Sequence, residues 1–180
     1  TDRPIMLDHL RDLLADPNAT LRAEVLAELA ALQRHDDFTD VILTDASGQI
    51  VLSVHGETGS LPDYSRAAIA ESLRTGIPTL IDLHLDERSA EPHIAVVAPI
   101  QPVGAVLLIA HAADYLYPLL QSWPVPSESA ESLLVRRDGD EVVFLNELRH
   151  RQNTALQFRF PMAETTLPAA QAIQGVMGVT

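Results

Sequence analysis

Residues 41–54 read VILTDASGQIVLSV, and this segment is the strongest indication of the fold class. It holds two short runs of aliphatic and β-branched residues, 41–44 and 50–54, on either side of Asp45-Ala46-Ser47-Gly48. Asp, Ser and Gly at these offsets are typical of a tight turn, and β-branched runs favour strands. We therefore predict an antiparallel hairpin, and with it a sheet, in the first third of the chain.

The residues before the hairpin predict helix. Apolar residues between positions 5 and 15 recur every three or four residues, the spacing of one helical face. Asp16-Pro17-Asn18 interrupts this pattern, and either Asn18 or Thr20 can then cap a second helix. The apolar stripe of that second helix is Leu21, Val25, Leu29 and Leu32. We therefore assign residues 1–37 to a long N-terminal helical segment.

The residues after the hairpin predict one helix and three more strands. Asp63 can cap a helix over residues 64–74, and Gly76 ends it. The strands are predicted by alternating or wholly apolar runs at 79–86, 93–100 and 104–110. Strands with both faces apolar indicate a sheet that is covered on each side. The fold class is therefore α+β, with an antiparallel five-stranded sheet in a domain over residues 38–113.

A second, smaller unit is predicted beyond a proline-rich junction. Residues 114–122 read as a helix that Trp123-Pro124-Val125-Pro126 ends, and we place a connecting segment at 114–126. A buried Trp123 there would fix the angle between the units, a structural role. Residues 127–180 then begin the pattern again, with predicted strands at 132–135, 142–145 and 155–160 and a helix at 167–174. We expect an incomplete copy of the first unit.

Composition excludes several classes of chemistry. The 180 residues include 12 Arg but no Lys and no Cys, and the formal net charge is −13. Disulfides, thiolate nucleophiles and iron–sulfur clusters need Cys, and Schiff bases need Lys. The strongly negative charge repels phosphate backbones, so we expect no nucleic-acid partner. No residue pattern indicates a cofactor.

The chain also lacks the sequence of a membrane span. Its longest apolar run, residues 103–110, is far shorter than the roughly 20 residues that cross a bilayer. The opening Thr1-Asp2-Arg3-Pro4 does not resemble a signal peptide. Because the sequence begins without Met, we expect it to be a piece of a longer protein.

The order of these elements resembles the double-Cache sensor domains of bacterial membrane receptors, whose sheets are PAS-like. The resemblance covers roughly residues 20–178, and it sharpens over the three strings YPLLQSWP at 117–124, AESLLVRR at 130–137 and FLNELRH at 144–150. Similar strings occur in sensor regions attached to histidine kinases and diguanylate cyclases. The resemblance identifies the second unit with the membrane-proximal, partial PAS-like domain of such receptors.

This resemblance implies a periplasmic, extracytoplasmic sensor in an inner-membrane protein, held between flanking transmembrane helices. It implies a small organic ligand, such as an amino acid, a carboxylate or an amine, in the membrane-distal unit. The N-terminal helix would relay the signal, and it offers a surface for a homodimer. The sensor piece itself would not be an enzyme, although an attached output domain can be a kinase or a cyclase.

Five polar residues are the candidate ligand-binding residues. Tyr64 and Arg66 start the helix expected to border a pocket, where guanidinium and hydroxyl groups suit a carboxylate. Asp82 and His84 share one face of a strand, and with His93 on the following strand they form a polar pocket wall. The alternative is that all five are solvated surface groups, with Arg66 paired to a nearby acid.

No catalytic residue and no metal site is predicted. The spacing of His84, Asp86, Glu87 and His93 fits no recognised metal signature, and the motifs G-x-S-x-G and H-E-x-x-H are missing from the sequence. Two other functions stay open. In a structural or dimerising module, the stripe Leu21, Val25, Leu29 and Leu32 would face a partner chain. In a small α+β enzyme, acidic and His side chains would converge in a cleft.

Overall fold

The structure is a computed structural model that describes residues 3–16, 18–86, 89–122, 131–164 and 166–175. The chain divides into two compact units. Residues 1–82 and 93–111 form the first unit, and residues 83–92 and 112–180 form the second. The predicted junction from Trp123 to Pro126 lies outside the described residues, so the role predicted for Trp123 stays a prediction.

Two helices open the first unit, as predicted: α1 (Arg3–Ala15) and α2 (Ala19–Asp36). Asn18, not Thr20, caps α2, because its side-chain oxygen accepts hydrogen bonds of 3.0 Å from the backbone N–H groups of Thr20 and Leu21. The helix ends where Asp37 takes a left-handed conformation with φ of 53°.

A five-stranded sheet follows in the order β2-β1-β5-β4-β3. Its strands are β1 (Asp40–Asp45), β2 (Ile50–Ser53), β3 (Thr79–Leu85), β4 (Pro92–Ile100) and β5 (Gly104–His111). The pairs β1–β2, β1–β5 and β4–β5 are antiparallel. The predicted α+β class and its five-stranded sheet are therefore confirmed.

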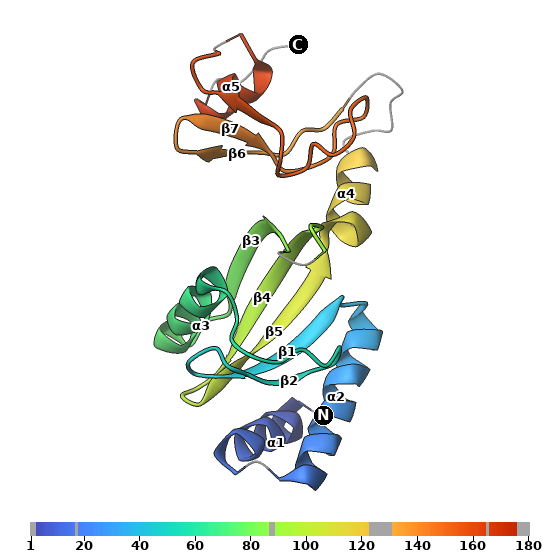
Figure 1. The fold of residues 1–180 in the computed structure, drawn as a ribbon, viewed down its shortest axis with the longest axis vertical. Helices are drawn as coiled ribbons and strands as arrows, with labels where there is room; N and C mark the ends of the chain where they lie inside the picture. Colours follow the sequence, from blue (N-terminus) through green and yellow to red (C-terminus); the bar gives the residue numbers. More distant parts are fainter. Residues whose placement is uncertain (1–2, 17, 87–88, 123–130, 165, 176–180) are drawn as a thin grey trace. The chain divides into compact units, whose positions relative to one another are not determined.

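Helices cover both faces of this sheet (Figure 1). One apolar cluster joins α1 and α2 to the sheet, through buried residues that include Leu10, Leu13, Val25, Leu29, Val41 and Leu43. A second cluster lies under α3 (Asp63–Thr75), through residues that include Ile42, Ile69, Ile81, Ala95, Val97 and Leu107. We call these two sides the α2 face and the α3 face of the sheet.

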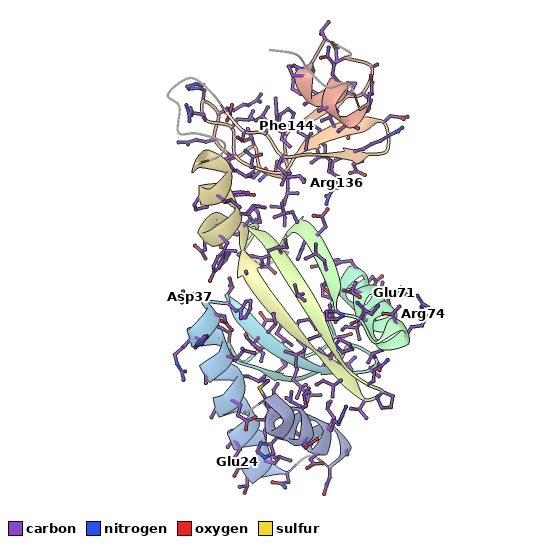
Figure 2. All side chains as sticks on the ribbon, turned by 180° about the vertical axis from the view of Figure 1, so that it is seen from behind. Glu24, Asp37, Glu71, Arg74, Arg136 and Phe144 are labelled. Carbon is purple, nitrogen blue, oxygen red and sulfur yellow. The ribbon has the colours of Figure 1, made fainter. Side chains whose placement is uncertain are left out.

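The stripe on α2 packs inside the chain. Val25 and Leu29 are fully buried in the α2-face cluster, and Leu21 and Leu32 pack against it. These four side chains contact the sheet and its neighbouring helix. Val25 and Leu29 therefore cannot face a partner chain, because they cover the apolar face of the sheet, whereas a structural or dimerising function stays a prediction. On α3, by contrast, Glu71 and Arg74 form an ion pair on the outer surface (Figure 2).

The turn between β1 and β2 shows why the opening hairpin forms. One carboxylate oxygen of Asp45 accepts three hydrogen bonds, from the Ser47 N–H at 2.8 Å, the Ser47 hydroxyl at 2.7 Å and the Gln49 N–H at 3.0 Å. Burial raises the pKa of Asp45, but these hydrogen bonds outweigh it and hold the pKa below its usual value. Gly48 completes the turn with φ of +82°.

The second unit contains α4 (Ala112–Ser122), a three-stranded sheet in the order β6-β7-β8, and α5 (Pro168–Ile173). Its strands are β6 (Val135–Asp138), β7 (Glu141–Phe144) and β8 (Arg159–Pro161). Here the second strand of the hairpin is central, whereas in the first unit the first strand of the hairpin, β1, pairs with β5. The described part of the second unit therefore does not repeat the strand order of the first.

Two predicted strands of the second unit were misplaced. The first strand, predicted at residues 132–135, begins at Val135 and ends at Asp138. The strand predicted at 155–160 begins only at Arg159, because the residues before it form a turn. Glu147 holds that turn: its carboxylate accepts 3.0 Å hydrogen bonds from the N–H and the hydroxyl of Thr154. Leu156 accordingly has φ of +59°, which no strand residue adopts.

Membrane-spanning helices are not found in the described part of the chain, since none of its helices is both long enough and apolar enough to cross a bilayer.

Candidate functional site

Tyr64 and Arg66 lie at the start of α3, on the surface. Pro62 occupies the cap position and Asp63 is the first helical residue, so the predicted cap at Asp63 is wrong. The Asp63 carboxylate instead accepts a hydrogen bond from the Arg66 guanidinium. The Arg66 stem packs on the β1–β2 turn, because a Cβ on Gly48 would lie 2.7 Å from Arg66 Cγ. Tyr64 is 40% exposed.

Asp82 and His84 share one face of β3, as predicted. Ile81 and Leu83 alternate with them and are buried, and Ile81 belongs to the α3-face cluster. Because successive residues of a strand point to opposite sides, Asp82 and His84 lie on the α2 face.

His93 lies on the other face of the sheet. It is 8% exposed and shares the parity of Ala95 and Val97, which pack in the α3-face cluster. The structure therefore does not bring His93 to the same face as Asp82 and His84.

Tyr64 and Arg66 are also far from His93. Arg66 lies at the β1–β2 turn, which adjoins Gly104, because Asp45 is the register partner of Gly104. Gly104 pairs with Ile100, and His93 is seven residues from Ile100 along β4, a span of about 23 Å. The five predicted residues are thus distributed over two ends and two faces of the sheet.

A set of polar residues shares the α3 face at the His93 end of the sheet, spread over the strands β2, β1, β5 and β4. It consists of Asp40, Ser53, His93 and His111, and we call it the polar end. His93 and His111 are partners in the β4–β5 register. The distance from His93 Nε2 to His111 Nδ1 is 2.8 Å, and the ring centroids are 4.4 Å apart.

Asp40 is the acidic member of the polar end. Its carboxylate accepts hydrogen bonds from the Val41 N–H at 2.8 Å and from the Ser53 hydroxyl at 3.0 Å. Burial raises the pKa of Asp40 above its usual value, although these two hydrogen bonds oppose the shift. Asp40 pairs in register with Ile109, which makes it a diagonal neighbour of His111 on the same face, at about 7–8 Å.

The polar end can recognise a small polar molecule. A buried carboxylate attracts an ammonium group, and imidazole and hydroxyl groups can donate to or accept from a carboxylate or an amide. Asp40, Ser53 and His111 are not among the residues predicted from the sequence. His111 had a readable signal: a short turn at 101–103 joins two apolar runs, and an antiparallel hairpin about that turn places residue 93 opposite residue 111.

Comparison with solved structures places this fold in a known class. The ligand-binding domain of Mlp24 with asparagine aligns with a TM-score of 0.55 and 16% identity, over 87% of this chain and 65% of that one. The ligand-binding domain of the Pseudomonas fluorescens chemoreceptor CtaA in complex with L-isoleucine gives 0.50 and 14%, over 86% and 62%. The extracellular domain of vpHK1S-Z8, which is named as a histidine kinase, gives 0.50 and 13%, over 76% and 72%.

At these identities the comparison establishes the fold. The chain has the Cache/PAS-like fold of extracellular sensor domains, so the resemblance to double-Cache sensors is confirmed at that level. It spans less than two thirds of the Mlp24 and CtaA domains. No family model and no curated protein sequence matches the chain.

Proposed function

We propose that this chain is the extracytoplasmic ligand-sensing domain of a bacterial transmembrane signalling protein. It binds a small organic molecule on the α3 face of the first unit and is not itself an enzyme. The observation that carries the proposal is the polar end, in which a buried Asp40 carboxylate and two His side chains lie on the same face of the sheet as the apolar cluster under α3. Titratable side chains gathered in a buried place are candidates for a functional site.

The ligand in this proposal carries a cationic nitrogen. Its ammonium group would lie at Asp40, and His93 with Ser53 would contact its remaining polar atoms. Two domains of the same fold hold asparagine and L-isoleucine, which supports an amino acid or a related amine. Tyr64 with Arg66, and Asp82 with His84, remain predicted binding residues for a ligand seated elsewhere on the unit.

The proposed signal relay runs through β1, because the side chains of this strand point to both faces of the sheet. Asp40 and Ile42 point to the α3 face, while Val41 and Leu43 pack in the cluster that holds α2. A ligand that displaces Asp40 would shift β1 and therefore the packing of α2. We propose that α1 and α2 transmit this shift to flanking transmembrane helices and to an attached kinase or cyclase. The parent protein would do so as a monomer or as a homodimer.

Thermal unfolding of the full chain tests the proposal. The protein is first unfolded and refolded to remove any retained compound, and its unfolding midpoint is measured with amino acids, amines and small carboxylates at millimolar concentration. A compound at 100 times its dissociation constant adds about 2.7 kcal/mol to the free energy of unfolding. We expect at least one amine-bearing compound to raise the midpoint in a saturable way.

Matched variants locate the bound compound. Asp40→Asn should abolish the shift caused by an amine, because the buried carboxylate is lost, whereas Asp82→Asn on the other face should leave it unchanged. Loss of binding in Asp82→Asn or Arg66→Gln, with Asp40→Asn unaffected, would move the site to those residues. A panel without any saturable shift would contradict the proposal.

A further inference from the structure

We propose that His93 and His111, with Glu91, form a binding site for a divalent transition-metal ion, for which zinc matches the donors best. One ligand atom from each of the three residues lies within 4.8 Å of the other two. The inference rests on this donor geometry and does not require the organic ligand proposed above.

The two His side chains are set by the β4–β5 ladder. His93 and His111 are register partners. The backbone N–H of His111 donates a 2.9 Å hydrogen bond to the Thr39 hydroxyl, which fixes this end of the strand. Glu91 is joined to His93 through Pro92 alone, so its position follows from the start of β4. Three donors thus come from two adjacent strand ends, which is a rigid support for a metal ion.

The spacing of the nitrogens is close to that of a coordinated pair. Zinc binds imidazole nitrogens at 2.0–2.1 Å in tetrahedral geometry, which places two such nitrogens about 3.3 Å apart. His93 Nε2 and His111 Nδ1 are 2.8 Å apart, so the rings must separate by about 0.5 Å to admit the ion. His111 is only half-buried and can make this adjustment. In the contact between His93 and His111, one contacting nitrogen carries a proton and the other accepts it. When a metal ion binds between the rings, that proton would move to the other nitrogen of its own ring.

The burial of the three residues and the charge of the chain favour binding of a metal cation from solvent. His93 is buried, His111 is half-buried and Glu91 is exposed, so the group of donors reaches the surface at Glu91. The formal charge of −13 draws cations to the chain. Two imidazoles and one carboxylate leave the fourth tetrahedral position of zinc for water or an exogenous ligand.

Calorimetric titration with zinc chloride tests the site. The full chain, freed of any affinity tag and treated with a chelator, is titrated without organic ligand. We expect saturable binding of one ion per chain. Loss of an outer-sphere partner alone costs 10–100-fold in metal affinity, so His111→Gln and His93→Gln should each weaken binding by at least about 100-fold.

His35→Gln is the matched control, because His35 is an exposed His that contacts a carboxylate, Asp36, at 2.9 Å. It should bind zinc like the wild type. Cobalt provides a second readout: the wild type should show the intense visible absorption of tetrahedral Co²⁺, and Glu91→Gln should alter that spectrum. If His93→Gln fails to fold, the half-buried His111→Gln keeps the test decisive. Equal zinc affinity in wild type and His111→Gln, or no binding at millimolar zinc, would overturn the inference and leave the sensor proposal untouched.

Discussion

Gly48 is the residue on which the opening hairpin and α3 meet. Its φ of +82° disfavours any other residue, by roughly 1–2 kcal/mol for a left-handed conformation. Gly56 has nearly the same φ, +77°, but a Cβ there would meet nothing within 4 Å, whereas a Cβ on Gly48 would press on Arg66. Comparing substitutions at Gly48 and Gly56 therefore separates the effect of backbone strain from the effect of crowding by Arg66.

We predict that Gly48→Ala destabilises the chain more than Gly56→Ala does, by about 1–3 kcal/mol of overpacking against the Arg66 stem. Urea unfolding of both variants measures the difference. In the background of Arg66→Ala the excess should disappear. Equal losses in the two alanine variants would show that the Arg66 stem does not pack on the turn.

Asp40 makes the second prediction at this scale. Its pKa is raised from 3.8 in the folded state, so the folded chain binds the proton more tightly than the unfolded chain does. The free energy of unfolding should therefore fall as pH rises from about 3.8 through the raised pKa. Asp40→Asn should lack this decrease. The difference between wild type and Asp40→Asn, measured by urea unfolding from pH 3 to 8, isolates the effect, and a difference that grows with pH would contradict it.

At the scale of elements, α1 and α2 are joined by a hydrogen bond of 2.8 Å between His9 and Glu28. This bond, opposed by partial burial, raises the pKa of His9 above 6.5. Its stabilising effect should be complete below pH 6.5 and should be lost as pH rises through the higher folded pKa.

We expect His9→Gln to flatten this part of the pH dependence of unfolding, and Glu28→Gln to do the same. The double variant should add nothing to either single change, because both remove one interaction. Unfolding free energies across pH 5 to 9 provide the measurement. A wild-type slope in His9→Gln would show that the helices are not coupled through this pair.

The elements were largely predictable because their signals are local. Turn chemistry at Asp45 and Gly48, the cap at Asn18 and the alternation around Ile81 each determine a few neighbouring residues. The failures include a local one, the cap expected at Asp63, and one that depends on a residue outside the predicted strand: the strand expected at 155–160 is broken by Glu147, seven residues before Thr154. The site was less predictable still, since Asp40, Ser53 and His111 come together only through strand register.

In the molecule as a whole, the proposed relay requires that a ligand bound on the α3 face change the packing on the α2 face. β1 is the shared strand, with Asp40 toward the polar end and Val41 in the cluster that holds α2. The second unit, by comparison, has a separate core around Phe144, with Phe158 and Phe160 packed against it. The ligand response should therefore begin in the first unit.

Amide NMR of the labelled full chain, titrated with the compound that gives the largest thermal shift, tests whether binding on the α3 face reaches α2. We expect saturable shifts at the amides of Asp40, Ser53 and His93, followed by shifts along α2, and neither set in Asp40→Asn. Saturable shifts confined to Asp82 and His84, or an unchanged spectrum with every compound of the panel, would contradict it.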